Sequence, residues 1–312
     1  MKIAYLILAH DQPSLFGRLL GALAGSSARF YAHIDAKVDD SPFRSAVAGR
    51  AVQFVARPVK VNWGGYSQVE AMLRLIELAS AHGPHDYYIF LSGRDYPLQS
   101  CAAIDAHLVA SAGISYMNFY ALADGTDFVA KVRRHCYYDW YARLPGRWLK
   151  RVANRVVRDI SKVLPERAFI PGMQPYRGST SWCLSQAVIT QVLAFVANPA
   201  NRAFLDFFRS VNCSDEIFFQ TIVLNSPLAS TLQGYQEDVL GRAPGDMKNE
   251  NKVSLHYIDW NPQREDPAIF DAGDFTKMTG SGKFFARKFD GVKSAVVLDM
   301  IDAARGASDH HH

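Results

Sequence analysis

Short apolar runs alternate with amphipathic stretches through the first hundred residues of the chain. Four runs have the length and composition of buried strands, at residues 2–9, 29–34, 52–56 and 87–91. Two stretches between them repeat apolar residues about every 3.6 positions and predict helices, at 14–24 and 67–82. This order is typical of a mostly parallel sheet flanked by helices, so we predict an α/β fold of the Rossmann-like kind.

Ligands of such sheets bind beyond the carboxyl ends of the strands. The turns that follow the predicted strands contain polar, aromatic and glycine residues, at 10–13, 35–37, 63–65 and 92–95. These are the residue types that a nucleotide site needs. We therefore expect residues 1–125 to form a nucleotide-binding half.

The alternation resumes after a distinct middle segment. Strands are predicted at 179–184 and 253–257, helices at 186–196, 202–211 and 215–224, and a loop at 280–283 before the apolar run 284–289. We expect residues 171–305 to complete one domain, with 126–170 inserted into it. Residues 306–312 are expected to be a tail, because they end in the Asp-His-His-His run of a truncated purification tag.

The middle segment is unusually basic. From Lys131 to Arg167 there are eleven Lys or Arg against three acids, a local net charge of +8 in a chain whose total is +4. Residues 148–164 combine apolar side chains at helical spacing with Lys or Arg at most other positions, which predicts a basic amphipathic helix. Two interpretations stay open: peripheral contact with an anionic membrane, or packing on the domain with a solvated basic face.

Composition places the chain among ordinary globular proteins, with about half of its residues apolar and a fifth charged. Its four cysteines are far apart and lack a metal-ligand spacing, so we expect reduced thiols. The apolar first ten residues are too short to cross a bilayer and lack a signal-peptide cleavage pattern. We expect a cytoplasmic protein, with peripheral contact at the inner membrane surface left open.

Several common catalytic and binding motifs are absent. The sequence has no GxGxxG, no P-loop, no HExxH, no GxSxG and no DxD. The DxD pair holds a divalent cation on the diphosphate in many sugar-nucleotide transferases. If this chain uses such a donor, Lys or Arg must neutralise the phosphates instead.

Three clusters of residues could carry chemistry. Ser214 is a natural helix N-cap with Asp215 and Glu216 after it, which is either a capped helix start or a carboxylate held ionised as a general base. Arg287 and Lys288 stand among aromatic residues, either as cations at the edge of an element or as a diphosphate clamp. Asp35 ends a strand, and Trp63 adjoins glycines in a turn, where a base could stack on its ring unless the ring belongs to the core.

In combination these motifs resemble the core-2/I-branching glycosyltransferase family, which includes peptide O-xylosyltransferases and bacterial relatives. The resemblance runs in family order over nearly the whole chain. Its motifs are Ala-His at 9–10, His-Ile-Asp-Ala-Lys at 33–37, Val-Asn-Trp-Gly-Gly-Tyr-Ser-Gln-Val at 61–69, Leu-Ser-Gly-Arg-Asp-Tyr-Pro-Leu at 91–98, Arg-Gly-Ser at 177–179, Ser-Asp-Glu at 214–216 and Phe-Ala-Arg-Lys-Phe-Asp at 285–290. It implies a GT-A-like fold and inverting transfer of a sugar, such as GlcNAc or xylose, from a UDP-sugar to a glycan, glycolipid or glycoconjugate. It also implies that the reaction is metal-independent, so we expect no metal and no cofactor.

The resemblance also implies roles for individual residues. Glu216 would be the general base, and the acceptor would contact Gly178, Ser179, Trp182 and Asp215. The donor would contact Leu8, Ala9, His10, Asp35, Trp63, Asp95 and Lys288. The family's second diphosphate cation does not align cleanly here, and Arg264 and Arg287 are the two candidates for it.

Two rival interpretations come from other classes of protein. A non-catalytic protein that binds nucleotides or carbohydrates on the same fold would leave a UDP-sugar intact. A nucleic-acid-binding protein would use the basic segment, but that charge is confined to one stretch and no nucleic-acid module is present, so we expect no nucleic-acid partner.

Overall fold

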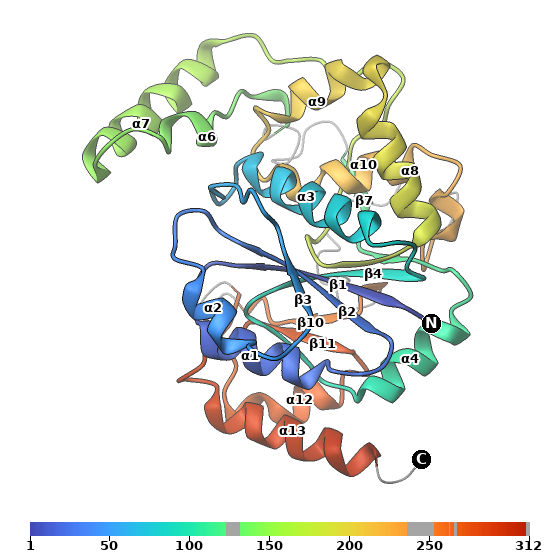
Figure 1. Cartoon of the computed structure of the whole chain (residues 1–312). Helices are drawn as coiled ribbons and strands as arrows, with labels where there is room; N and C mark the ends of the chain where they lie inside the picture. The colour runs from blue at the N-terminus through green and yellow to red at the C-terminus, as the bar shows by residue number, and fades with distance from the viewer. Residues whose placement is uncertain (123–131, 236–252, 262, 265–266, 310–312) are drawn as a thin grey trace.

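The computed structural model describes residues 1–122, 132–235, 253–261, 263–264 and 267–309 of the 312-residue chain. A six-stranded sheet in the order β3-β2-β1-β4-β9-β6 runs through the middle (Figure 1). The parallel strands are β1 (Ile3–Ala9), β2 (Ala28–Ile34), β3 (Val52–Phe54) and β4 (Tyr87–Ser92). β9 (Trp182–Ser185) pairs antiparallel with both β4 and β6 (Tyr116–Met117). The predicted mixed α/β fold with a mostly parallel sheet is confirmed.

Helices cover both faces of this sheet because successive side chains of a strand point to opposite sides. Ile3, Tyr5 and Ile7 of β1 pack on one side, and Ala4 and Leu6 pack on the other. The first side is covered by α1 (Pro13–Ala22), α2 (Ser41–Ala46), α4 (Cys101–Ala110), α12 (Phe275–Thr279) and α13 (Ala295–Asp309). The second is covered by α3 (Ser67–Ala81), α8 (Gln186–Ala197), α9 (Arg202–Phe208) and α10 (Phe218–Leu224). Both groups of helices are visible above and below the sheet in Figure 1.

Smaller elements complete the fold. A three-stranded sheet joins β5 (Asp95–Pro97), β11 (Phe285–Arg287) and β10 (His256–Ile258), and β7 (Tyr120–Ala121) pairs with β8 (Tyr176–Arg177). The short 3-10 turns are η1 (Pro199–Asn201), η2 (Ser214–Glu216), η3 (Ala229–Thr231) and η6 (Ala272–Asp274). The basic segment forms α6 (Tyr138–Tyr141) and α7 (Arg147–Val163), which extend away from the body in Figure 1. No helix in the described ranges has both the length and the hydrophobicity to cross a membrane.

Several sequence-based expectations about the elements need correction. The helix predicted at 215–224 is divided, because Ile217 (φ −126°, ψ −35°) leaves helical geometry between η2 and α10. The strands predicted at 179–184 and 253–257 occupy Trp182–Ser185 and His256–Ile258 instead. The alanine-rich helix α4 was missed because it has no clear apolar stripe, and α13 continues to Asp309, beyond residue 305.

A glycine fixes the contact between the ends of β6 and β8. Gly178 follows β8 and donates its N–H to the Glu216 carbonyl (2.8 Å). A Cβ built on Gly178 would lie 1.7 Å from the Asn118 carbonyl oxygen, closer than any two atoms can approach without bonding. Only glycine lets these two backbone segments touch.

We predict that Gly178→Ala lowers the free energy of unfolding by about 2 kcal/mol or more, because the new methyl group must push two buried segments apart. Gly306→Ala is the matched control, since a Cβ there meets nothing within 4 Å and alanine is the better helix former. Urea unfolding measures both. Equal stability of Gly178→Ala and wild type would contradict the close contact.

Candidate functional site

The site described here lies where β1, β2 and β4 end, an edge we call the carboxyl edge of the sheet. β9 runs antiparallel to β4, so the residues that precede β9 lie at this same edge. The turns after β1, β2 and β4 and the segment before β9 supply most of the residues that the sequence singled out.

A buried carboxylate organises the end of β4. Asp95 is 1% exposed and accepts hydrogen bonds from the Ser92 N–H (2.8 Å), the Ser92 hydroxyl (2.7 Å) and Arg287 Nη1 (3.0 Å). His256 Nε2 lies 3.6 Å from Asp95 Oδ2. Burial alone would raise the pKa of Asp95, but Arg287, His256 and Ser92 favour the charged form and lower that pKa to about 2. Asp95 is therefore an anion that holds a cation in place.

The neighbouring turns bring the residues that are expected to contact the sugar donor to the same edge of the sheet. Gly93 donates its N–H to the Leu8 carbonyl (2.9 Å), and a Cβ on Gly93 would lie 2.8 Å from the Ala9 side chain. Asp35 ends β2 in a tight turn, in which its Oδ1 accepts from the Lys37 N–H (2.9 Å) and the Val61 N–H (3.3 Å). Leu8, Ala9 and Asp35 thus line adjacent strand ends.

Trp63 is 81% exposed, so it does not belong to the core. Its turn is fixed from two sides. Cys213 donates its N–H to the Gly64 carbonyl (3.0 Å), and Asp139 of α6 accepts from Asn62 Nδ2 (2.8 Å) and the Ser67 N–H (2.8 Å). An exposed indole on a fixed turn is a surface on which a flat ring can stack.

The two arginines considered for the second diphosphate cation, Arg264 and Arg287, differ in how many of their N–H groups are still available for a ligand. Arg287 uses Nη1 for Asp95 and the Ser92 hydroxyl, which leaves three N–H groups without a partner among the described residues. Arg264 uses Nη1 for Asp259 (3.2 Å) and Asp274 (2.7 Å) and Nη2 for Asp274 (2.9 Å) and the Ile269 carbonyl (2.7 Å). Among the described residues, only the Nε–H of Arg264 is left without a partner.

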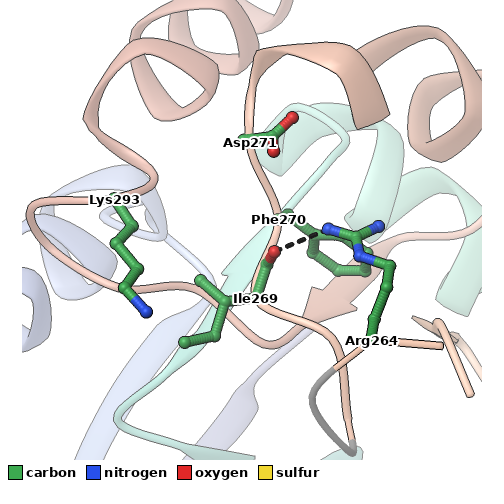
Figure 2. Close-up of a pocket in the computed structure, with 5 residues that line it drawn as sticks. All are labelled: Arg264, Ile269, Phe270, Asp271 and Lys293. Atoms are coloured by element: carbon green, nitrogen blue, oxygen red, sulfur yellow. Dashed lines mark hydrogen bonds between the residues drawn. The ribbon is translucent and has the colours of Figure 1, made fainter. Parts of the chain in front are cut away.

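Figure 2 shows the surroundings of Arg264. An open pocket of about 520 Å³ is lined by Arg264, Ile269, Phe270, Asp271 and Lys293, and Lys293 lies on the other side of Ile269 from the guanidinium. The segment through Ile269 runs beside Lys288, because Lys288 exchanges backbone hydrogen bonds with Ala268 and Phe270. Arg264 is therefore near the Lys288 backbone but occupied by acids.

The run from Arg287 to Asp290 is tied to the strand ends. Arg94, in the turn after β4, donates to Asp290 Oδ2 (2.7 Å) and to the Phe289 carbonyl (3.0 Å). Gln12, in the turn after β1, donates to the same Asp290 oxygen (2.6 Å). The cation-bearing run of the C-terminal part is thereby fixed at the carboxyl edge.

Glu216 carries an ion pair that the sequence analysis did not anticipate. Its Oε2 accepts from both Arg177 Nε (2.8 Å) and Arg177 Nη2 (2.5 Å), and Arg177 Nη1 donates to the Tyr120 hydroxyl (2.6 Å). Burial disfavours the charged guanidinium, but Glu216 and Tyr120 raise the pKa of Arg177. Glu216 Oε1 makes no hydrogen bond within the described part of the chain, and the side chain is 26% exposed. One oxygen is oriented and the other is open.

Asp215, the adjacent carboxylate, has a different environment. It is 5% exposed, and its Oδ2 accepts from Gln68 Nε2 (2.7 Å) and the Thr180 hydroxyl (3.3 Å). Burial and the neighbouring Glu216 charge raise the pKa of Asp215 to about 7. Of the two consecutive carboxylates, Asp215 is buried, whereas Glu216 is partly solvated.

Ser214 does not cap a helix, so that expectation is wrong. Cys213 takes the left-handed conformation (φ 53°) and begins η2, while Ser214 lies inside this turn with its buried hydroxyl unpartnered among the described residues. Asp215 and Glu216 precede α10 rather than forming its first turn. Glu216 is oriented by Arg177, and not by a helix start.

A chain of contacts connects the Glu216 and Asp95 clusters. Gly178 binds the Glu216 carbonyl and touches the Asn118 backbone, and Asn118 Oδ1 accepts from the Ser254 N–H (3.1 Å). Ser254 lies two residues before His256, whose ring faces Asp95. The two clusters thus belong to one continuous region.

Trp182 and His10, which were expected to contact the acceptor and the donor, do not take part in the contacts described above. Trp182 is 1% exposed and stacks on Phe90 (5.5 Å between ring centroids), so its ring offers no surface to an acceptor. His10 is exposed and lies 3.8 Å from Asp11. Ser179 does belong to the site, since its carbonyl accepts from Gln220 Nε2 (2.8 Å) next to Gly178.

Sequence reasoning missed Arg177, Gln68 and His256. Arg177 stands in the Arg-Gly-Ser motif beside Gly178 and Ser179, which were selected. Its place in that motif was the available signal, because its burial is visible only in the structure. Gln68 stands in the motif at 61–69, whereas His256 had no local signal. Neither contact could be predicted, because the partners Asp215 and Asp95 lie 147 and 161 positions away.

Comparison with known proteins agrees with the motifs. A sequence model described as Core-2/I-Branching enzyme matches residues 3–279. Xylosyltransferase 2 of Rattus norvegicus is 24% identical and that of Canis lupus familiaris 26%, each over 97% of this chain and 33% of theirs. Xylosyltransferase 1 of Homo sapiens is 22% identical over 97% of this chain and 30% of its own. The chain thus spans about a third of the length of these relatives.

Similarity to solved structures is weak. The apo form of mouse xyloside xylosyltransferase 1 superposes with a TM-score of 0.32 and 11% identity, over 71% of this chain and 81% of that one.

We predict a pH-dependent effect of Asp215→Asn on stability. The folded pKa of about 7 exceeds the unfolded value of 3.8, so the wild type loses stability as the pH rises between these values. The free energy of unfolding of the variant should rise relative to that of the wild type over this interval. The difference should reach a plateau above pH 7, with an upper bound of roughly 4 kcal/mol. Urea unfolding at a series of pH values measures the difference.

Asp206→Asn provides the control for this measurement. The Asp206 carboxyl is at the surface, and its hydrogen bond from Arg202 lowers its pKa, so neutralising it should give no gain as the pH rises. A stability difference for Asp215→Asn that does not change with pH would refute the raised pKa.

Proposed function

Because the chain belongs to the Core-2/I-Branching enzyme family, we propose that it is a glycosyltransferase that uses a UDP-sugar donor. It moves the sugar, GlcNAc or xylose, to a hydroxyl of a glycan or glycoconjugate, with inversion at the anomeric carbon and without a metal ion. The observation that carries this proposal is the arrangement of Glu216, with one carboxylate oxygen fixed by Arg177 and the other open at the carboxyl edge of the sheet.

In the proposed reaction Glu216 is the general base. The acceptor hydroxyl attacks the anomeric carbon as its proton passes to the open Oε1 of Glu216, and the bond from that carbon to the diphosphate oxygen breaks in the same step. Arg177 is a positioning residue, because it holds Oε2 and so directs Oε1. Gly178 and Ser179, which are fixed against the same turn, would line the acceptor side.

The leaving UDP gains negative charge that cations must stabilise in the transition state. Arg287 suits this role because Asp95 fixes it while three of its N–H groups stay available among the described residues. Lys288 follows it on a run that Arg94 and Gln12 hold at the strand ends through Asp290. Arg264 is the weaker candidate because acids occupy most of its donors.

The uridine would lie across the ends of β1 and β2. Leu8 and Ala9 would line its pocket, Asp35 would accept hydrogen bonds from it, and the exposed Trp63 would stack on the base. Among the described residues, no group of three or more His, Cys, Asp or Glu side chains is arranged to hold a metal ion. The fixed cations are the groups we propose for the work of charge neutralisation.

We predict that Glu216→Gln lowers the rate of transfer by roughly 10²–10⁴ and leaves UDP affinity nearly unchanged, because the amide cannot accept the proton but still contacts Arg177. Released UDP measures the rate, and calorimetry measures the affinity. Thermal unfolding checks the fold, since Arg177 is mostly buried. Glu70→Gln, in a surface pair with Arg74, is the control.

Wild-type turnover by Glu216→Gln would refute the base assignment. If Asp215→Asn lost transfer while Glu216→Gln kept it, the base would be the neighbouring carboxylate.

We also predict that UDP-GlcNAc or UDP-xylose raises the melting temperature in excess EDTA, because a ligand that binds the native state stabilises it and no cation is needed. The GDP-sugar with the same sugar is the control for recognition of the uracil ring. Arg287→Gln should reduce the shift. A shift or transfer that appears only after Mn²⁺ or Mg²⁺ is added would refute the metal-free clamp, and intact donor with every acceptor would favour a binding protein.

A further inference from the structure

The helix α7 leaves an apolar stripe without cover. Trp148, Val152, Val156 and Ile160 follow one another at intervals of four residues and are 40–71% exposed, and Val163 extends the stripe at 82%. Ser161 is the helix's only buried residue. A surface helix of a globular protein normally turns such a stripe toward the core, so this one is available to another phase or molecule.

A row of cations borders this stripe. Arg147, Arg151, Arg155, Arg158 and Lys162 recur at intervals of three or four residues, directly beside the apolar positions. The helix has six Lys or Arg and one acid, Asp159, which lies 3.2 Å from Lys162 and 3.9 Å from Arg155. Arg147, Lys150, Arg151 and Arg158 make no ion pair with any described residue.

The projecting segment is fixed at both ends. Before α7, Asp139 of α6 accepts from Asn62, the Ser67 N–H and the Ser67 hydroxyl (2.6 Å). After α7, Arg167 donates to the Ser210 hydroxyl (2.7 Å) and the Val132 carbonyl (2.9 Å). Figure 1 shows that α7 projects from the body between these two contacts. The exposed fractions of its apolar side chains show that the stripe is accessible to solvent.

We propose that α7 lies in the headgroup region of an anionic phospholipid bilayer. Its apolar stripe would enter the acyl boundary while the bordering cations contact lipid phosphates, and Trp148 with the 59%-exposed Trp140 would sit at the interface. A second copy of the chain is a poorer occupant, because covering one stripe with the other would bring two helices of net charge +5 together.

This orientation would place the turn of Trp63 beside the bilayer, because Asp139 joins α6 to that turn. An acceptor that carries a lipid would then meet the protein at the surface where the site opens. This last step rests on the proposed function, whereas bilayer binding itself does not.

Co-sedimentation with vesicles tests the proposal. The full chain should sediment with phosphatidylcholine vesicles that contain phosphatidylglycerol, more weakly at high salt, and not with phosphatidylcholine alone. Arg151→Gln with Arg158→Gln should weaken binding roughly tenfold or more, since each cation near the surface contributes about fivefold. Trp148→Ser with Ile160→Ser should also weaken it, because less apolar area enters the bilayer.

Val109→Ser, on the exposed surface of α4, is the control for the apolar change and should bind as the wild type does. Thermal unfolding checks that the variants are folded, as the exposure of the altered residues leads us to expect. No binding to anionic vesicles, or binding that neither pair of substitutions weakens, would overturn the proposal. So would a dimer in sedimentation velocity that Trp148→Ser with Ile160→Ser dissociates, because the stripe would then be covered by a second copy.

Discussion

The buried carboxylate of Asp95 links the N-terminal half of the chain to its last strand. Asp95 begins β5, just after the turn that follows β4, and binds Arg287 from the last strand, β11. A charge with 1% of its surface exposed is stable only when hydrogen bonds and an opposite charge replace water. That requirement fixes the C-terminal run against the strand ends, and the proposed donor site depends on this placement.

Two consecutive acids, Asp215 and Glu216, differ in burial and in their hydrogen-bond partners. Asp215 is enclosed by Gln68 and Thr180, and burial favours its protonated form near neutral pH. Glu216 is partly solvated and shares Oε2 with Arg177. Below its pKa of about 7, Asp215 is mostly protonated and adds no negative charge next to Glu216.

The sequence was sufficient for the four parallel strands of the sheet and for most of the motif residues, because both are encoded locally. It did not predict β6 or the antiparallel pairing of β9. β1, β2, β4, α1 and α3 follow from apolar periodicity, and Leu8, Ala9, Asp35 and Asp95 lie at strand ends as the turn positions indicated. Arg177 as the partner of Glu216, and His256 as a neighbour of Asp95, could not be derived, since each depends on long-range packing. The split of the 215–224 segment follows from the backbone of Cys213 and Ile217, which apolar spacing does not report.

Asp139 gives the projecting segment a structural role within the domain. Its carboxylate satisfies the Asn62 amide and two donors of Ser67, one of them the main-chain N–H at the start of α3. A shortened chain without the projection would expose those donors and lose the partner that braces the indole-bearing turn. Removing α6 together with α7 to obtain a more compact domain would therefore loosen the turn that carries Trp63.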